Sequence, residues 1–315
     1  VLTFILVLPI YFLYKHDQTK DLIDNSYKLL GKFGFMIAAF YSIYFLCVCI
    51  YNFTFYNNYI SNIMAPKVSL VLISVSIIAC ALYGAFKGIT GIAQTSTIVF
   101  ILFVAGTLFL ICSQMPLVKD YNFTPFFYSG TETFFTEAQI MLSHCPCIAL
   151  IGMLFPLVKG DMKKGIFLWN SGVFLTLILL TFVMVGSLGD YIKTQMFPFY
   201  SMSAIAGIGI FKRMDSLYIA LWTSGLFIKI SLFLYAFTIC IEKFLGRKKA
   251  KIALFIGSAL VCVISLFISF KSDIYFFLQN SISVTVFTLT ATTFIPLVLL
   301  VLSKFKKRSV SSSKL

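Results

Sequence analysis

The sequence predicts an all-α polytopic membrane protein, and three observations support this fold class. Sixty per cent of the residues are hydrophobic and only 11% are charged, whereas soluble domains carry charge on roughly a quarter of their residues. The mean hydropathy is +0.97. The apolar residues form blocks, most of them as long as the roughly 17–25 residues that cross ~30 Å of hydrocarbon. We therefore expect one transmembrane domain over residues 1–302 and a basic tail over residues 303–315.

The apolar blocks predict nine membrane-spanning helices. They cover residues 1–14, 33–57, 68–86, 91–113, 132–158, 165–189, 215–240, 252–270 and 281–302. The segments between these blocks are short, so we expect no soluble domain within the chain.

The positive charges follow the alternation of the loops. Of the 25 Lys and Arg residues, 18 lie in every second loop and in the tail, 6 lie in the opposite loops, and the last is Lys229. The positive-inside rule then places the C-terminus and the segments 15–32, 159–164 and 242–251 in the cytoplasm. The net charge of +14 does not indicate a nucleic-acid partner, because no soluble basic face exists to bind one. The basic tail can contact anionic lipid of the bilayer.

This orientation leaves the N-terminus outside, and the chain begins with Val1 inside an apolar run. The first twenty residues lack the basic region and the small-residue cleavage site of a signal peptide. We expect that the chain lacks one upstream helix. The alternative is that translation starts here at an unusual codon.

The cysteines and histidines predict neither disulfides nor a cofactor. All eight cysteines lie in apolar runs, where cysteine usually acts as a small hydrophobic residue. Cys145 and Cys147 flank Pro146, next to His144, but no further Cys or His follows at the spacing of a zinc site. With only two histidines in the chain, an intramembrane enzyme is not expected either.

The run 136–156 departs from a plain apolar helix near its middle. Ser143, His144 and Pro146 interrupt it, and proline removes a backbone donor and clashes with the preceding turn. Interrupted membrane helices are used by transporters to aim backbone groups at a substrate or ion. We therefore predict that Ser143, His144, Cys145, Pro146 and Cys147 bind a ligand. A simple proline kink is the alternative.

Lys229 is the second departure, since it lies in the middle of the apolar run 215–240. A charged group at that depth costs at least ~2.5–3.5 kcal/mol, so intramembrane charges are functional by default. Trp222 and Gly225 precede Lys229 on the same helical face, and Gly225 would let another helix approach. The alternative is a structural lysine bonded to backbone carbonyls inside the bundle.

These residues resemble a known family. The stretch from residue 197 to residue 235 is similar to the spore germination permeases, which are the B subunits of germinant receptors in the amino acid–polyamine–cation transporter superfamily. The resemblance rests on Phe197-Pro198, Arg213-x-Asp215, Trp222, Phe227-Ile228-Lys229-Ile230-Ser231, Tyr235 and the segment "MLFPLVK" at 153–159.

The resemblance implies a leucine-transporter-like inverted-repeat helix bundle, with nine of the expected ten transmembrane helices present. It implies a mid-membrane site at the broken sixth helix, which corresponds to residues 132–158. The chain departs from the family at Pro146-Cys147, where a Gly-Glu pair is common. In sodium-coupled relatives a cation lies on the eighth helix, so Lys229 is expected to replace that ion and to release a proton during the cycle.

The resemblance also implies a function and partners. We expect a membrane subunit of a spore germinant receptor that binds a small nutrient such as an amino acid. It would act in the spore inner membrane with a soluble-domain membrane subunit and a lipoprotein. A proton-coupled amino acid permease is the alternative, because the two functions share one fold.

Overall fold

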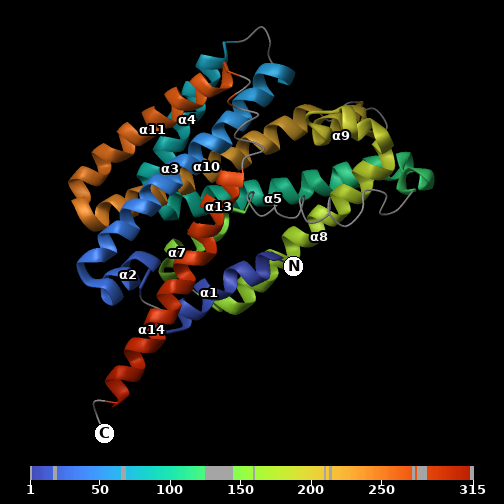
Figure 1. Ribbon diagram of the computed structural model, residues 1–315. Coiled ribbons are helices and arrows are strands. Elements are labelled where there is room, and N and C mark those ends of the chain that lie inside the picture. The colour runs from blue at the N-terminus through green and yellow to red at the C-terminus, as the bar shows by residue number, and fades with distance from the viewer. Residues whose placement is uncertain are drawn as a thin grey trace. The chain divides into compact units, whose positions relative to one another are not determined.

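The computed structural model describes residues 2–16, 20–64, 69–124, 145–158, 160–208, 211–212, 215–271, 274 and 282–312. This part of the chain is helical apart from one two-residue β ladder (Figure 1). Seven helical segments are long and apolar enough to cross a membrane, and two shorter apolar helices lie at 5–15 and 147–157. The chain is therefore a multi-pass membrane protein.

The helices and strands have the following bounds. The α-helices are α1 (Leu2–His16), α2 (Leu22–Leu30), α3 (Gly34–Tyr59), α4 (Leu70–Lys87), α5 (Ile89–Gln114), α7 (Cys147–Leu154), α8 (Met162–Leu188), α9 (Pro198–Ile205), α10 (Asp215–Leu245), α11 (Arg247–Ser269), α13 (Ile282–Leu289) and α14 (Ile295–Ser312). The 3-10 turns are η1 (Gly31–Phe33), η3 (Met115–Leu117), η4 (Asp120–Phe123), η5 (Phe155–Leu157) and η6 (Gly189–Thr194). Two π-helical turns are η2 (Ile60–Met64) and η7 (Thr290–Phe294). Strands β1 (Gly207–Ile208) and β2 (Phe211–Lys212) pair antiparallel, with Gly207 opposite Lys212.

Seven of the nine predicted spans correspond to these long segments. Helices α3, α4, α5, α8, α10 and α11 and the run from α13 through η7 to α14 lie where the sequence placed them. The predicted first span corresponds to α1. Of the predicted span 132–158, the structure describes only residues 145–158, in which α7 and η5 are found.

Two compact units divide the chain, one of residues 1–89, 132–162 and 230–315, the other of residues 90–131 and 163–229. In the first unit α3 packs against α11, which also packs against α4 (Figure 1). A buried polar network joins the three helices. Ser74 donates to the side-chain oxygen of Asn57 at 2.9 Å, and the Asn57 amide donates to Ser265 at 3.5 Å. Buried amides that are hydrogen-bonded across helices stabilise a membrane bundle.

Helix α2 lies in a segment that the sequence had assigned to a loop. Its N-cap is Asp21, whose carboxylate accepts the N–H of Asp24 at 2.7 Å. Leu22 and Ile23 are buried, and α2 packs against α3, α7 and α14. This short helix is therefore part of the core of the first unit.

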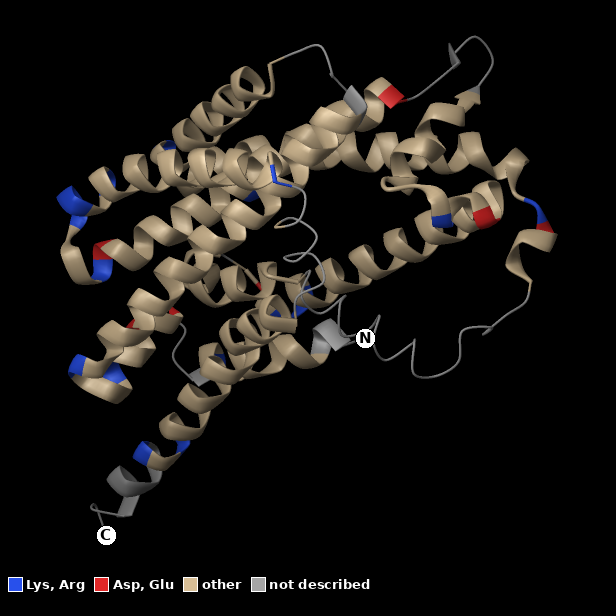
Figure 2. Cartoon of the chain, turned by 45° about the horizontal axis from the view of Figure 1, so that its top comes forward, with Lys and Arg blue, Asp and Glu red and all other residues tan. Residues whose placement is uncertain are grey.

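Ionic contacts hold α2 against two distant segments of the first unit. Lys243, in the last turn of α10, lies 2.6 Å from Asp24 and 3.1 Å from Asp21. Lys306 of α14 donates to the backbone carbonyl of Lys28 at 3.0 Å. Figure 2 shows that the charged residues gather at helix ends, while the middles of the helices are almost free of charge.

The second unit contains α5, α8, α9 and the first half of α10. Helix α9 is held to α5 by Gln114, whose amide donates to the carbonyl of Met202 at 2.9 Å. The turn after α8 is closed by Asn122, which donates to the carbonyl of Gly186 at 2.7 Å. Only 17% of the most apolar window of α5, and the same share for α8, is buried within the protein. Their exposed Leu, Ile and Phe side chains suit a lipid surrounding.

Candidate functional site

The first feature of the candidate site is the start of α7 at Cys147. Cys145 and Pro146 are not helical. Pro146 is the N-cap, and its carbonyl accepts the N–H of Ala149 at 3.2 Å. Proline has no N–H to donate to a preceding turn, so a helix can begin after it but does not continue smoothly through it. Pro146 is buried, while Cys145 and Cys147 are half-buried.

A second interruption lies between α13 and α14, where η7 widens the helix to a π-helical turn. Its cause is readable in the sequence, because Pro296 has no N–H and would clash with the carbonyl four residues earlier, that of Thr292. The widened turn leaves the carbonyl of Ala291 free to accept the Tyr41 hydroxyl of α3 at 2.6 Å. Such π-turns occur frequently at functional sites.

Tyr44 of α3 lies between these two interruptions and is fully buried. Its hydroxyl lies near the hydroxyl of Thr288 on α13 and within electrostatic range of the thiols of Cys145 and Cys147. Within the part of the chain that the structure describes, this hydroxyl makes no hydrogen bond of full geometry. A buried polar group without a partner costs about 1–3 kcal/mol. Tyr44, Thr288, Cys145 and Cys147 are called the Tyr44 site below.

Aromatic rings border the Tyr44 site. Phe287 of α13 lies 5.3 Å from the Tyr44 ring and 5.4 Å from the Phe40 ring, measured between centroids. Tyr44 also contacts Phe45 in an edge-on arrangement at 5.5 Å. The surroundings of the hydroxyl therefore combine a few polar donors and acceptors with apolar rings, a composition typical of sites for small molecules.

The chemistry that this site offers is hydrogen bonding without charge. The hydroxyls of Tyr44 and Thr288 each donate and accept, and the two thiols are weak donors. Among the residues that the structure describes, no three His, Cys, Asp or Glu side chains converge as ligands for a metal ion. The Tyr44 site suits a small polar ligand with an apolar part.

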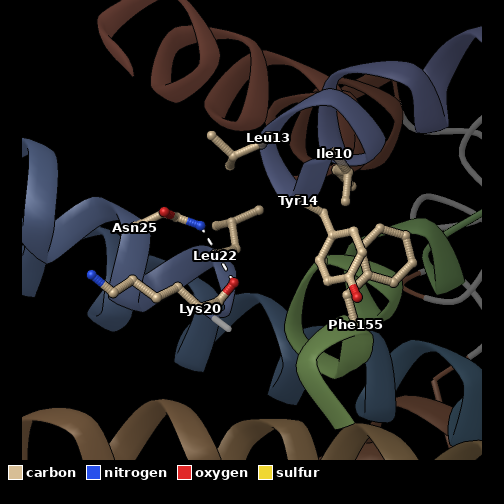
Figure 3. A pocket seen from close by; sticks show the side chains of 8 residues that line it. Ile10, Leu13, Tyr14, Lys20, Leu22, Asn25 and Phe155 are labelled. Carbon is tan, nitrogen blue, oxygen red and sulfur yellow. Dashed lines mark hydrogen bonds between the residues drawn. The ribbon is translucent and has the colours of Figure 1, made fainter. Parts of the chain in front are cut away.

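A separate hollow lies between α1, α2 and the end of α7, and Figure 3 shows its walls. Tyr14 and Phe155 meet edge-on across it at 5.0 Å, and Asn25 donates to the carbonyl of Lys20 at 3.4 Å. Its volume of ≈ 10 Å³ is about that of one water molecule. A ligand of the size of an amino acid does not fit there, so this hollow is not a candidate site for such a ligand.

The other predicted site residues lie elsewhere or outside the described residues. Ser143 and His144 lie outside them. Lys229 is in the middle of α10 and half-buried. Trp222 stacks on Tyr218 at 6.2 Å and approaches Phe197 at 6.5 Å. A Cβ added at Gly225 would meet no described atom within 4 Å, so the expected close approach of a helix at Gly225 is not seen in this part of the chain.

Sequence reasoning overlooked Tyr44, Thr288 and the π-turn. The available signal was Pro296, which follows the threonine-rich stretch 288–293 inside a predicted span. Nothing in the sequence distinguishes Tyr44 from the many other aromatic residues of α3, because its special feature, a buried hydroxyl without a hydrogen bond of full geometry to the described residues, is revealed only by the fold.

The long apolar helices, with their exposed faces and buried polar contacts, define an integral multi-pass membrane protein. The sequence profile of the spore germination protein family matches residues 1–274. The chain therefore belongs to the spore germination protein family, a transporter-like family that is not known for enzymes. No curated protein and no solved structure gave a significant match to the chain.

Proposed function

We propose that the chain is the membrane subunit of a spore germinant receptor, which binds a small nutrient such as an amino acid within the membrane and triggers germination. Family membership supports the general role. The structural observation that carries the ligand site is the buried hydroxyl of Tyr44, which has no hydrogen bond of full geometry among the described residues and lies on the helix that packs beside α13 and its π-turn. A ligand would supply the missing hydrogen bond.

The proposed fold is the leucine-transporter-like inverted repeat. In this proposal the helix that contains Pro146 is one of the two broken helices of that fold, and residues 143–147 form one wall of the ligand site. In the described part of that wall, the thiols of Cys145 and Cys147 lie within electrostatic range of the Tyr44 hydroxyl, which supports this placement. Because the side chains of this site carry no charge, the carboxylate and ammonium groups of a bound amino acid would interact with backbone groups beside Pro146.

Lys229 has a separate role in this proposal. Its ammonium would replace the cation that sodium-coupled relatives hold on the corresponding helix, and it would release a proton in one state of the cycle. Trp222 and Gly225 lie two turns and one turn before it, respectively, on the same face and would support it. A Lys229→Met variant that is made in normal amounts and responds normally would refute this role.

The test of the ligand site compares two threonines of α13 that are both buried, Thr288 and Thr285. Thr288→Val removes the hydroxyl beside Tyr44 at almost constant volume, and Thr285→Val is the matched control one turn earlier. We expect Thr288→Val to raise the nutrient concentration needed for half-maximal germination about tenfold, which corresponds to one lost hydrogen bond. Thr285→Val should leave it unchanged, with equal protein abundance in both. Equal responses of the two variants would contradict the site.

Pro146→Ala tests the interruption itself. If Cys145 to Cys147 line the ligand site, restoring a helix-forming residue should lower the germination response more than the protein level, and His144→Ala should behave in the same way. Parallel loss of response and protein would support a purely structural kink.

A proton-coupled amino acid permease is the second candidate, favoured by the transporter-like family. Uptake of a labelled amino acid into vesicles that contain only this chain would support the permease. A response that requires a soluble-domain membrane subunit and a lipoprotein, without uptake, would support the receptor.

A further inference from the structure

Five positive side chains from two distant parts of the sequence gather at one end of the first unit. Helix α4 ends at Lys87, and α11, which packs against α4, begins at Arg247. Figure 2 shows the basic residues at the turn from α10 to α11. The side chains are all exposed and are here called the basic cluster: Lys87, Arg247, Lys248, Lys249 and Lys251.

An exposed apolar surface adjoins the basic cluster along α4 and α11. Phe86 is 51% exposed and Phe255 54% exposed, and their ring centroids lie 6.4 Å apart, so the two helices present one continuous aromatic surface. Tyr83, Ile252 and Ile256 extend it and are also exposed. These five residues are here called the apolar shelf.

Two lysines of the basic cluster make cation–π contacts with aromatic rings of the apolar shelf. The Lys251 ammonium lies 5.5 Å from the centre of the Phe86 ring, and that of Lys87 lies 5.3 Å from the centre of the Tyr83 ring. Cation–π contacts of this length hold the charged ends above the rings. The positive charges are therefore placed at the edge of a surface that is otherwise apolar, as expected at the boundary between headgroups and hydrocarbon.

Among the described residues, no ion pair neutralises the basic cluster, and the acidic residues near it are fewer than its five positive charges. Glu242 is the acidic residue nearest to it along the chain, while Asp21 and Asp24 already pair with Lys243. Arg247 and its two neighbours also occupy the first turn of α11, where the helix dipole disfavours cations. Gly246 offers this turn no side-chain cap. An external anion would reduce the repulsion among the positive side chains and would also interact favourably with the N-terminal end of the α11 dipole.

We propose that the basic cluster and the apolar shelf together bind an anionic phospholipid of the bilayer. Its phosphate would contact Arg247, Lys248 and Lys249, and its acyl chains would lie along the rings of Phe86 and Phe255. The apolar shelf favours a lipid over a free anion as the ligand, because only a lipid can contact the aromatic surface and the positive charges at the same time. This binding is distinct from nutrient binding at the Tyr44 site.

The first test uses the purified full chain in neutral detergent and native mass spectrometry of bound phosphatidylglycerol, with phosphatidylcholine as the uncharged reference. The triple variant Arg247→Gln, Lys248→Gln, Lys249→Gln removes three charges from the cluster. The control Lys32→Gln, Lys119→Gln, Lys271→Gln removes three exposed charges that lie outside both the cluster and the basic tail. Since each cation near an anionic surface contributes about fivefold in affinity, the cluster variant should bind phosphatidylglycerol on the order of 100-fold more weakly.

The control variant should change this affinity by less than about threefold, and phosphatidylcholine binding should not change in either variant. Equal loss in both variants would show a general effect of charge and would overturn the site. If the triple variant is poorly folded, the single variants Lys248→Gln and Lys249→Gln replace it, each with an expected loss of about fivefold. Single variants without effect would overturn the site as well.

The second test separates a lipid from a free phosphate. Phe86→Ala with Phe255→Ala should weaken phosphatidylglycerol binding severalfold, because apolar contact with the acyl chains is lost. Inorganic phosphate at millimolar concentration should not displace the lipid. Displacement by phosphate, or normal lipid binding by the double alanine variant, would show that only an anion is recognised and would overturn the proposal.

Discussion

Tyr41 and Tyr44 are one helical turn apart on α3 and are both fully buried, yet their hydroxyls differ in partners. The Tyr41 hydroxyl donates to the Ala291 carbonyl at 2.6 Å, while that of Tyr44 makes no hydrogen bond of full geometry within the described residues. Tyr41→Phe leaves a buried carbonyl without its donor, so it should cost about 1–3 kcal/mol of stability and lower the melting temperature in detergent.

Tyr44→Phe is the matched variant and should leave the melting temperature unchanged or slightly raised, because it removes a buried polar group that makes no hydrogen bond of full geometry with the described residues. Its germination response should nevertheless fall, since the nutrient loses the hydroxyl. A melting temperature reduced as much as in Tyr41→Phe would mean that the Tyr44 hydroxyl bonds within the protein and would remove it from the site.

Asp21 makes the stability of the protein depend on pH, and the direction of this dependence follows from the pKa of Asp21. Burial raises the pKa of Asp21 above its ordinary value of 3.8, and this effect exceeds the opposing pull of the Asp24 N–H and of Lys243. The folded chain therefore keeps this proton to a higher pH than the unfolded chain, so the contribution of Asp21 to stability falls as the pH rises above about 3.8 and stays lower beyond the raised pKa.

Asp21→Asn cannot ionise but still accepts the N–H of Asp24 as an N-cap. Its melting temperature relative to that of the parent protein should therefore increase between pH 4 and pH 7. Asp21→Ala also lacks the cap and should be less stable than Asp21→Asn at both pH values, by about 0.5–2 kcal/mol. A constant difference between the asparagine variant and the parent would refute the raised pKa.

At the scale of elements, the packing of α7 depends on Gly152. A Cβ at this position would lie 3.0 Å from a methyl group of Leu22 and 3.5 Å from one of Ile10, so α1, α2 and α7 meet with no room for a side chain. Gly152→Leu should overpack this contact and lower stability by about 1–3 kcal/mol, measured as a lower melting temperature in detergent.

Gly172 of α8 is the control, because a Cβ there would meet nothing within 4 Å among the described residues. Gly172→Leu should leave the melting temperature unchanged or raise it, because leucine favours the helix interior over glycine by up to about 1 kcal/mol. If the two leucine variants behaved alike, α7 would not be packed as tightly as the structure shows.

The elements also show where prediction from sequence succeeds and where it stops. Blocks of apolar residues predict long helices such as α5 and α8. A segment that faces lipid has to be apolar, long enough to cross the hydrocarbon and internally hydrogen-bonded, and the sequence shows the first two properties directly. Helix α2 was not predicted, because the polar residues in its sequence are typical of a loop. Its helical form depends on the Asp21 N-cap and on the burial of Leu22. The start of α7 directly after Pro146 agrees with the predicted effect of that proline, whereas the π-turn before Pro296 was not predicted, although proline is its cause as well.

For the proposed ligand site, sequence reasoning singled out residues 143–147, whose role stays a prediction, and did not single out Tyr44 or Thr288. Residues 143–147 stand out because polar residues and proline interrupt an apolar run. Tyr44 and Thr288 do not stand out, since tyrosine and threonine are common in membrane helices and their meeting depends on the packing of α3 beside α13. The roles of residues 143–147 and of Lys229 stay predictions.

At the scale of the whole molecule, the contacts of the first unit bear on topology. Lys243 reaches Asp21 and Asp24, and Lys306 reaches the carbonyl of Lys28. These contacts join the segments 15–32, 242–251 and 303–315 at one end of the unit, so the three segments must lie on the same side of any membrane that the unit crosses. The charge distribution had grouped the same three segments independently and assigned them to the cytoplasm.

Labelling of single cysteines in a variant that lacks the native ones tests this arrangement. A cysteine at position 248 and one at position 32 should react with a membrane-impermeant maleimide only after the cells are opened, and one at position 193 should react in intact cells. The difference follows from the cost of moving clustered Lys and Arg across the membrane during insertion. Positions 32 and 248 labelling on opposite sides would contradict the ionic contacts of α2 with α10. Both labelling from outside would leave those contacts intact but reverse the orientation.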